Sequence, residues 1–173
     1  MPNTSPPGKK LGKGMLVASW LGIMALLTYH FSGVEEDRHN PNRALSSNVG
    51  DGFTEIVLKR NALGHYVATG QINGETVTFL LDTGATMVAV PYHLGDKLGL
   101  EKGRAVPIKT ANGTSTSYIT TIDELRLGDI VATQVHGGLA VGLTGNEILL
   151  GMSFLSDLEI IQRGDSLIIR QYH

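Results

Sequence analysis

The part of the chain from Phe53 to His173 consists of short apolar stretches separated by turn pairs, and this pattern constrains the fold more than any other feature. Residues 75–81 alternate between two faces with a period of two, as in a half-buried strand. Asn73-Gly74, just before them, is the dipeptide that best fits a two-residue hairpin turn. No helical pattern alternates with the strands, which disfavours a doubly wound sheet. The sequence therefore predicts an all-β domain, closed or sandwiched.

Similar patterns predict the remaining elements of this domain. Pro91, with Leu94 and Leu98 on one face and Gly99 as the stop, indicates a short helix. A second short helix is expected over 152–156. Further strands are expected over 65–72, 88–90, 104–110, 114–127, 130–136, 147–151, 158–162 and 167–170.

An apolar run without a charged residue lies near the N-terminus, over residues 14–32. Its length is at the short end of what a helix needs to cross a bilayer. A cleaved signal peptide and a buried core helix are the alternatives. However, no Ala-x-Ala cleavage site follows, and no polar face is visible. Lysines precede the run and Glu35-Glu36-Asp37 follows it, which predicts the N-terminus inside and the bulk of the chain outside.

The resulting division has four parts: a disordered basic N-terminus (1–13), a transmembrane anchor (14–32), a linker (33–52) and a β domain (53–173). The linker is assigned because residues 33–52 are rich in polar and turn-forming residues and show no periodicity.

Composition excludes several classes of function. The formal net charge of −2 argues against nucleic-acid binding, which needs a basic excess. Cysteine is absent, so disulfides, thiolate metal sites and thiol nucleophiles are excluded. The histidines lack metal-ligand spacing, and Ser153 lacks the second glycine of a nucleophile elbow. We expect neither a metal nor a cofactor.

The stretch Phe79-Leu80-Leu81-Asp82-Thr83-Gly84-Ala85 is the most informative for chemistry. A carboxylate at the end of a buried strand is costly unless it is hydrogen-bonded or paired. Gly84 lets the backbone turn sharply beside it, and Thr83 offers a hydroxyl. The triplet alone also fits a turn former or a helix cap, which are commoner roles for an aspartate after a strand.

Two later motifs change that balance. Leu149-Leu150-Gly151 precedes the second short helix, and Ala111-Asn112-Gly113 sits at the tip of a predicted hairpin. Together with Asp82-Thr83-Gly84-Ala85, they resemble the retropepsin-like (clan AA) aspartic proteases, in particular the membrane-anchored bacterial ones. The resemblance covers residues 53–173 and implies a single-lobe closed β-barrel with one or two short helices.

The resemblance also implies roles for these residues. Asp82 would be catalytic, supported by its loop residues Thr83, Gly84 and Ala85. The hairpin tip Ala111-Asn112-Gly113 would form a flap over the substrate, and Leu149-Leu150-Gly151 would pack beside the catalytic loop. Retroviral members carry an acidic residue and an arginine where this chain has Thr86 and Met152. We therefore do not expect their dimer-bracing ion pair.

Aspartic protease chemistry needs two carboxylates, and this chain has one Asp-Thr-Gly triplet. The sequence therefore predicts a homodimer in which two Asp82 residues activate a water to hydrolyse a peptide or protein substrate. By the resemblance, the chain is single-pass in the cell inner membrane, with a cytoplasmic N-terminus and a periplasmic protease domain. Two alternatives stay open: a non-catalytic, membrane-tethered binding or dimerisation module of the same fold, and a structural anchor protein with no ligand.

Overall fold

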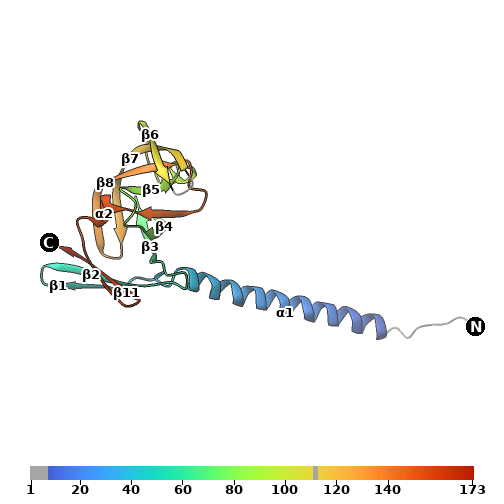
Figure 1. Cartoon of the computed structure of the whole chain (residues 1–173). Helices are drawn as coiled ribbons and strands as arrows, with labels where there is room; N and C mark the ends of the chain where they lie inside the picture. The colour runs from blue at the N-terminus through green and yellow to red at the C-terminus, as the bar shows by residue number, and fades with distance from the viewer. Residues whose placement is uncertain (1–7, 111–112) are drawn as a thin grey trace, which may run out of the picture. The chain divides into compact units, whose positions relative to one another are not determined.

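The computed structural model describes residues 8–110 and 113–173 (Figure 1). The chain divides into two compact units at the bond between Arg38 and His39. The first unit is helical and the second is mostly β.

Helix α1 (Gly8–His39) makes up the described part of the first unit and continues into the first residue of the second. Among the described residues, it is the one helix long and apolar enough to cross a membrane, over Gly12–His39. Its apolar side chains, such as Trp20 and Leu26, are exposed in the unit itself. The helix is therefore a candidate membrane anchor; a signal sequence near an N-terminus passes the same test of length and composition.

The helix is longer than the sequence predicts. Residues 8–13, expected to be disordered, and 33–39, expected to be linker, both continue it. Adding residues to an existing helix is cheap compared with starting one, and Glu35, Glu36 and Arg38 have good helix propensity.

The larger sheet of the second unit is a closed barrel. Its strands follow the order β3-β4-β9-β5-β8-β7-β6, and an additional pairing between β3 and β7 closes the ring, with β6 extending outward from β7. Its strands are β3 (Val67–Ile72), β4 (Glu75–Leu81), β5 (Val88–Pro91), β6 (Ala105–Thr110), β7 (Gly113–Leu127), β8 (Ile130–Ala140) and β9 (Glu147–Leu150). The predicted closed β-barrel is confirmed.

Closure of the barrel depends on a glycine. Gly70 lies in β3, between the strands β4 and β7. A Cβ atom on Gly70 would come within 2.4 Å of the Arg126 carbonyl oxygen and 2.7 Å of the Phe79 ring. Only a residue without a side chain lets β7 approach β3 this closely over the buried Phe79.

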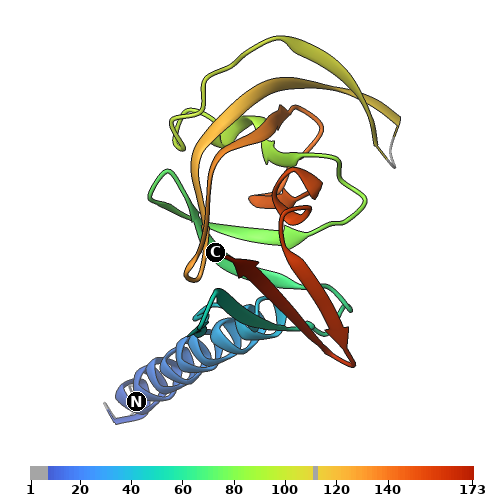
Figure 2. The same cartoon turned by 90° about the vertical axis from the view of Figure 1, so that its left-hand side faces the viewer.

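A second, four-stranded sheet has the order β1-β2-β11-β10 and lies at the opposite end of the unit from the β6–β7 hairpin (Figure 2). Ile56, Leu58 and Ile169 point from it into the core and are fully buried. On its outer face Arg170 joins Glu55 and Glu159 across three strands. Its strands are β1 (Ser47–Gly50), β2 (Phe53–Lys59), β10 (Glu159–Arg163) and β11 (Ser166–Tyr172).

The ion pairs of this outer face shift two titrating groups. Hydrogen bonds from the Tyr172 hydroxyl and from Arg170 hold the pKa of the Glu159 carboxyl below its ordinary value. The carboxylate of Glu55 raises the pKa of the Arg170 guanidinium. Buried apolar side chains thus stabilise one face of the four-stranded sheet, and ion pairs of Arg170 connect the strands on the other face.

Two short helices complete the unit: η1 (Tyr92–Leu94) and α2 (Met152–Leu155). Both were expected, but Pro91 is the last residue of β5 rather than the first helical residue. Gly99 ends the turn after η1 with a φ of 66°, as its position predicted.

The first strands of the second unit were not predicted. Residues 39–52, assigned to the linker, contain the buried Asn40 and Asn42 and the strand β1. Strand β2 was also missed. Strand β2 is stabilised by pairing with β11 at the far end of the domain, which no local pattern reveals, and β1 pairs in turn with β2.

We predict that Gly70→Ala destabilises the second unit by about 1–3 kcal/mol, because the added methyl group meets backbone on one side and a buried ring on the other. Urea unfolding of the full chain in detergent, followed by β-sheet circular dichroism, measures this change. Gly145→Ala is the matched control, since its Cβ would have its nearest neighbour at 4.0 Å. Equal midpoints for the two variants would contradict the role assigned to Gly70.

Candidate active site

Strand β9 lies between β4 and β5 and organises the centre of the barrel. It runs parallel to β4, with Leu81 opposite Leu150, and antiparallel to β5, with Ala89 opposite Leu149. Leu150 is fully buried. The strand that ends in Asp82 is therefore hydrogen-bonded to the strand that carries the second predicted motif.

Asp82 follows β4 directly and begins a tight loop. Its backbone N–H donates to the Leu150 carbonyl at 3.2 Å, and its own carbonyl accepts the N–H of Ala85 at 3.1 Å. The N–H of Gly84 donates to the Asp82 carboxylate oxygen Oδ1 at 2.9 Å. This last bond is typical of an aspartate that stabilises its own turn, and it fixes the direction of the carboxylate.

The Asp82 loop is open on one side. Asp82 and Ala85 are half-buried, whereas Thr83, Gly84 and Thr86 are exposed. A carboxylate oriented by one backbone donor, the Gly84 N–H, is thus presented at the surface of the single chain.

Gly151 packs against this loop from the other side. A Cβ atom on Gly151 would come within 2.4 Å of the Met87 carbonyl oxygen and 2.7 Å of the Ala85 carbonyl oxygen. The next residue, Met152, donates its N–H to that same Ala85 carbonyl at 2.8 Å. The glycine is required because two backbone segments meet at this point.

Ser153, in α2, braces the strand that follows the loop. Its hydroxyl donates to the His136 carbonyl at 2.6 Å and accepts the Val88 N–H at 3.0 Å. Its own N–H donates to the Thr86 carbonyl. No local sequence pattern predicts this role, because the three partners, Thr86, Val88 and His136, lie in different parts of the chain.

The predicted flap corresponds to the hairpin β6–β7. The hairpin extends to the pair Thr110 and Gly113, and Gly113 has a φ of 112°. Ala111 and Asn112 lie outside the described residues. The flap assignment of Ala111-Asn112-Gly113 therefore stays a prediction, with only the Gly113 turn conformation described.

A cation–aromatic cluster lies at the base of this hairpin. Lys102 Nζ donates to the Tyr92 hydroxyl at 2.8 Å and lies 4.0 Å from the centre of the Tyr118 ring. The hydrogen bond to Tyr92 raises the pKa of the Lys102 ammonium group. Because Tyr118 belongs to β7 and Tyr92 to η1, the cluster ties the hairpin base to the barrel.

The structure thus brings the Asp82 to Ala85 motif and the Leu149 to Gly151 motif into one centre. Within residues 8–110 and 113–173, no group of three or more His, Asp or Glu side chains could hold a metal ion. The chemistry available at this centre is that of an oriented, solvent-accessible carboxylate.

Comparison with known proteins agrees with this geometry. Residues 68–157, just over half of the chain, match the family described as "gag-polyprotein putative aspartyl protease". The crystal structure of a retropepsin-like aspartic protease from Rickettsia conorii superposes with a TM-score of 0.58 at 28% sequence identity, covering 74% of this chain and 96% of that one.

Two curated relatives are themselves uncharacterized. One, from the cobV 5' region of a Sinorhizobium species, is 34% identical over 134 residues, which are 75% of this chain and 58% of the relative. The other, RP867 of Rickettsia prowazekii (strain Madrid E), is 28% identical over 140 residues, 76% of this chain and 56% of the relative. The chain spans a little over half the length of each.

The closed barrel, the Asp82 loop and the packing of Gly151 against it define a single-lobe aspartic protease fold. The chain belongs to the retropepsin-like aspartic protease family represented by the gag-polyprotein aspartyl proteases.

We predict that Ser153→Ala lowers the stability of the second unit by about 1–3 kcal/mol, because the Val88 N–H and the His136 carbonyl both lose a partner. Thermal unfolding of the full chain measures this loss. Ser156→Ala, at an exposed serine just after α2, is the matched control and should change stability little. A Ser153→Ala chain as stable as the control would refute the bracing role.

Proposed function

We propose that the chain is an aspartic endopeptidase whose active site forms between two copies. The observation that carries this proposal is the Asp82 carboxylate, which is oriented by the Gly84 N–H at the end of the half-buried strand β4 and is accessible to solvent. Membership of the retropepsin-like family supports the same chemistry.

Two Asp82 carboxylates facing each other would share one proton, because like charges at such short range cannot both ionise. The ionised one accepts a proton from a water, whose oxygen attacks the carbon of the peptide carbonyl. The protonated one donates its proton to the carbonyl oxygen. The tetrahedral intermediate then breaks at the C–N bond: the proton taken from water leaves with the amine, and one hydroxyl of the intermediate returns a proton to the other carboxylate, which restores the pair.

The second carboxylate must come from another chain, because the sequence has one Asp-Thr-Gly triplet. A homodimer with a two-fold axis next to Asp82 supplies it. The exposure of Thr83 and Gly84 in the single chain favours this arrangement, since a second copy would cover them.

The substrate would be an extended peptide lying between the two Asp82 loops and the two β6–β7 hairpins. Ala111, Asn112 and Gly113 would cover it as the flap. Thr83, Gly84 and Ala85 would hold the catalytic loop, and Leu149, Leu150 and Gly151 would support it from behind. No metal or cofactor takes part in this mechanism.

We predict that Asp82→Asn abolishes peptide hydrolysis, because the amide can neither accept the proton of the water nor share a proton with its counterpart. Cleavage of casein at mildly acidic pH, with and without pepstatin, measures the loss. Asp157→Asn, at an exposed aspartate after α2, is the matched control and should retain activity.

A mixing experiment tests the dimer separately. Equal amounts of the wild-type and Asp82→Asn chains, allowed to pair at random, should retain about a quarter of the activity of wild-type pairs, because only one pair in four has two carboxylates. Activity that falls only to one half would mean that each chain works alone. A wild-type chain that dimerises without any cleavage would favour the non-catalytic binding module instead.

We further propose that α1 anchors the enzyme in the cell inner membrane, with the N-terminus cytoplasmic and residues 39–173 periplasmic. The lysines before the apolar stretch and the acidic residues after it favour this orientation. Two anchors in one membrane would also raise the effective concentration of the partner chain.

Protease accessibility tests this orientation. In spheroplasts, added proteinase should degrade the second unit, and it should not reach an epitope tag fused before Met1 until the membrane is dissolved. The opposite pattern of protection would overturn the orientation. Full recovery of the chain in the soluble fraction would overturn the anchor.

A further inference from the structure

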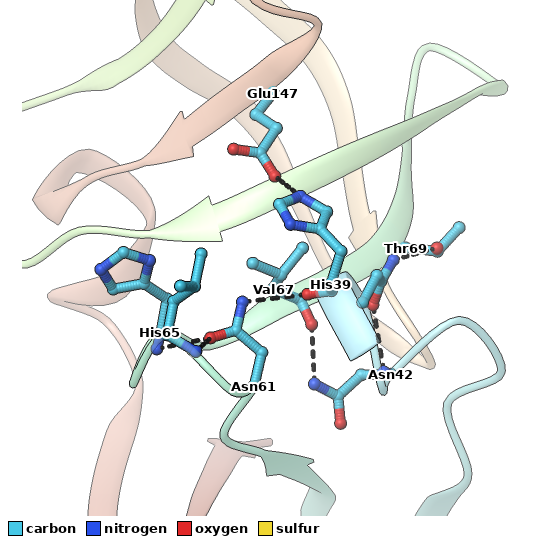
Figure 3. Close-up of polar contacts among 9 residues, drawn as sticks. His39, Asn42, Asn61, His65, Val67, Thr69 and Glu147 are labelled. Atoms are coloured by element: carbon cyan, nitrogen blue, oxygen red, sulfur yellow. Dashed lines mark hydrogen bonds and ion pairs between the residues drawn. The ribbon is translucent and has the colours of Figure 1, made fainter. Parts of the chain in front are cut away.

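The residues that directly follow the helical unit form a polar cluster with the barrel (Figure 3). We call His39, Asn40 and Asn42 the clasp, and all three belong to the same compact unit as the barrel. Asn40 and Asn42 are nearly fully buried, at 7% and 4% exposure, as is their neighbour Asn61 at 7%. Buried amides are costly unless each polar atom finds a partner, so three of them in one place indicate a built structure.

Asn42 joins the two sheets. Its side-chain oxygen accepts the Lys59 N–H at 2.7 Å, and its side-chain nitrogen donates to the carbonyls of Lys59 at 2.9 Å and Val67 at 2.7 Å. Its backbone carbonyl also accepts the Thr69 N–H at 3.1 Å. Lys59 ends β2 in the four-stranded sheet, whereas Val67 and Thr69 belong to β3 in the barrel.

Asn40 and Asn61 hold the clasp in place. The side-chain oxygen of Asn40 accepts the Asn42 N–H at 3.0 Å, and its side-chain nitrogen donates to the Thr69 hydroxyl at 2.9 Å. The side chain of Asn61 donates to the His39 carbonyl at 3.0 Å. The conformation of residues 39–42 is therefore specified by side chains on both sides of the segment.

His39 reaches a different strand. Its Nε2 lies 2.5 Å from Oε1 of Glu147, the first residue of β9 (Figure 3). Because a carboxylate accepts hydrogen bonds, the imidazole donates here. Both side chains are partly exposed, so the ion pair contributes little to the free energy of folding. Its expected effect is to hold His39 and Glu147 at a fixed separation.

These contacts span the strand that leads to Asp82. Thr69 on β3, Thr78 on β4 and Glu147 on β9 form one row across three neighbouring strands. The clasp binds both ends of this row, through Asn40 to Thr69 and through His39 to Glu147. It therefore holds the two strands on either side of β4 at the level of Thr78, in the middle of the strand that leads to Asp82.

We propose that the clasp belongs to the catalytic domain and positions the active site, with His39 and Asn42 as its positioning residues. Holding β3 and β9 at a fixed separation sets β4 between them. It also sets Leu150, whose carbonyl accepts the Asp82 N–H, and Gly151 beside the loop. The expected effect of the clasp on catalysis rests on the proposed protease function. Its effect on the conformation of the Asp82 loop can be measured without any enzymatic activity.

The test uses the full chain in detergent, with the variants His39→Ala, Glu147→Ala and the double variant. We expect each single variant to lower kcat about three- to tenfold with KM unchanged, because the loop is displaced while the substrate contacts remain. The double variant should be no worse than either single one, since all three lose the same contact. His39→Gln, which keeps a donor, should restore part of the rate. The substitutions His65→Ala and Glu101→Gln, at two exposed residues, are the matched controls and should leave kcat unchanged.

Amide hydrogen exchange provides the second readout, which separates positioning from a general loss of stability. In the His39 and Glu147 variants, exchange should quicken at the N–H groups of Asp82 and Ala85 and keep its rate in the β10–β11 hairpin. Asn42→Ala should show the same local change more strongly, and if that variant does not fold, the His39 and Glu147 variants decide.

Unchanged kcat in an active enzyme, or exchange that quickens evenly over the whole domain, would overturn the clasp. Should the wild-type chain show no activity that depends on Asp82, the protease proposal fails. In that case amide hydrogen exchange alone tests the clasp. Faster exchange at Asp82 and Ala85 in the variants supports the positioning role, and unchanged exchange at these residues overturns it.

Discussion

The insertion of β9 between β4 and β5 is the constraint on which the rest of the site depends. It pairs the strand before Asp82 with a strand from 65 or more residues later, so the Asp82 N–H meets the Leu150 carbonyl and Gly151 meets the backbone at Ala85. A turn-forming aspartate on a free loop would be mobile. Held between two strands and a helix start, the same residue becomes an oriented carboxylate, which is what catalysis by a paired site requires.

The sequence was sufficient for an all-β domain because the strand and hairpin signals are local, whereas the closed barrel was expected from the family resemblance. The alternation over 75–81 and the Asn73-Gly74 turn predict a hairpin without knowledge of the partner strands, and Asn73 does adopt a positive φ of 50°. The centre around Asp82 needed the family resemblance, since an Asp-Thr-Gly triplet alone is ambiguous. That resemblance also led to Leu149-Leu150-Gly151, which the structure places against the Asp82 loop.

The structural features that the sequence analysis did not predict have a common physical cause. Strand β2, the bracing by Ser153 and the burial of Asn40 and Asn42 all depend on partners far away in the sequence, and β1 depends on β2. An asparagine-rich stretch after an apolar helix reads as a linker, because asparagine favours turns in the absence of such partners. Here the asparagine amides replace backbone groups between two sheets, a role that periodicity does not reveal.

The pairing of β2 with β11 brings Thr54 opposite Gln171, so one sheet joins the beginning and the end of the domain. Such a fold has a high contact order, because β2 near the start of the domain pairs with β11, more than 100 residues later. During synthesis the helical unit emerges long before this sheet can be completed. The β domain is therefore still unfolded when α1 has been synthesised, and its folding is completed only after β11 has left the ribosome.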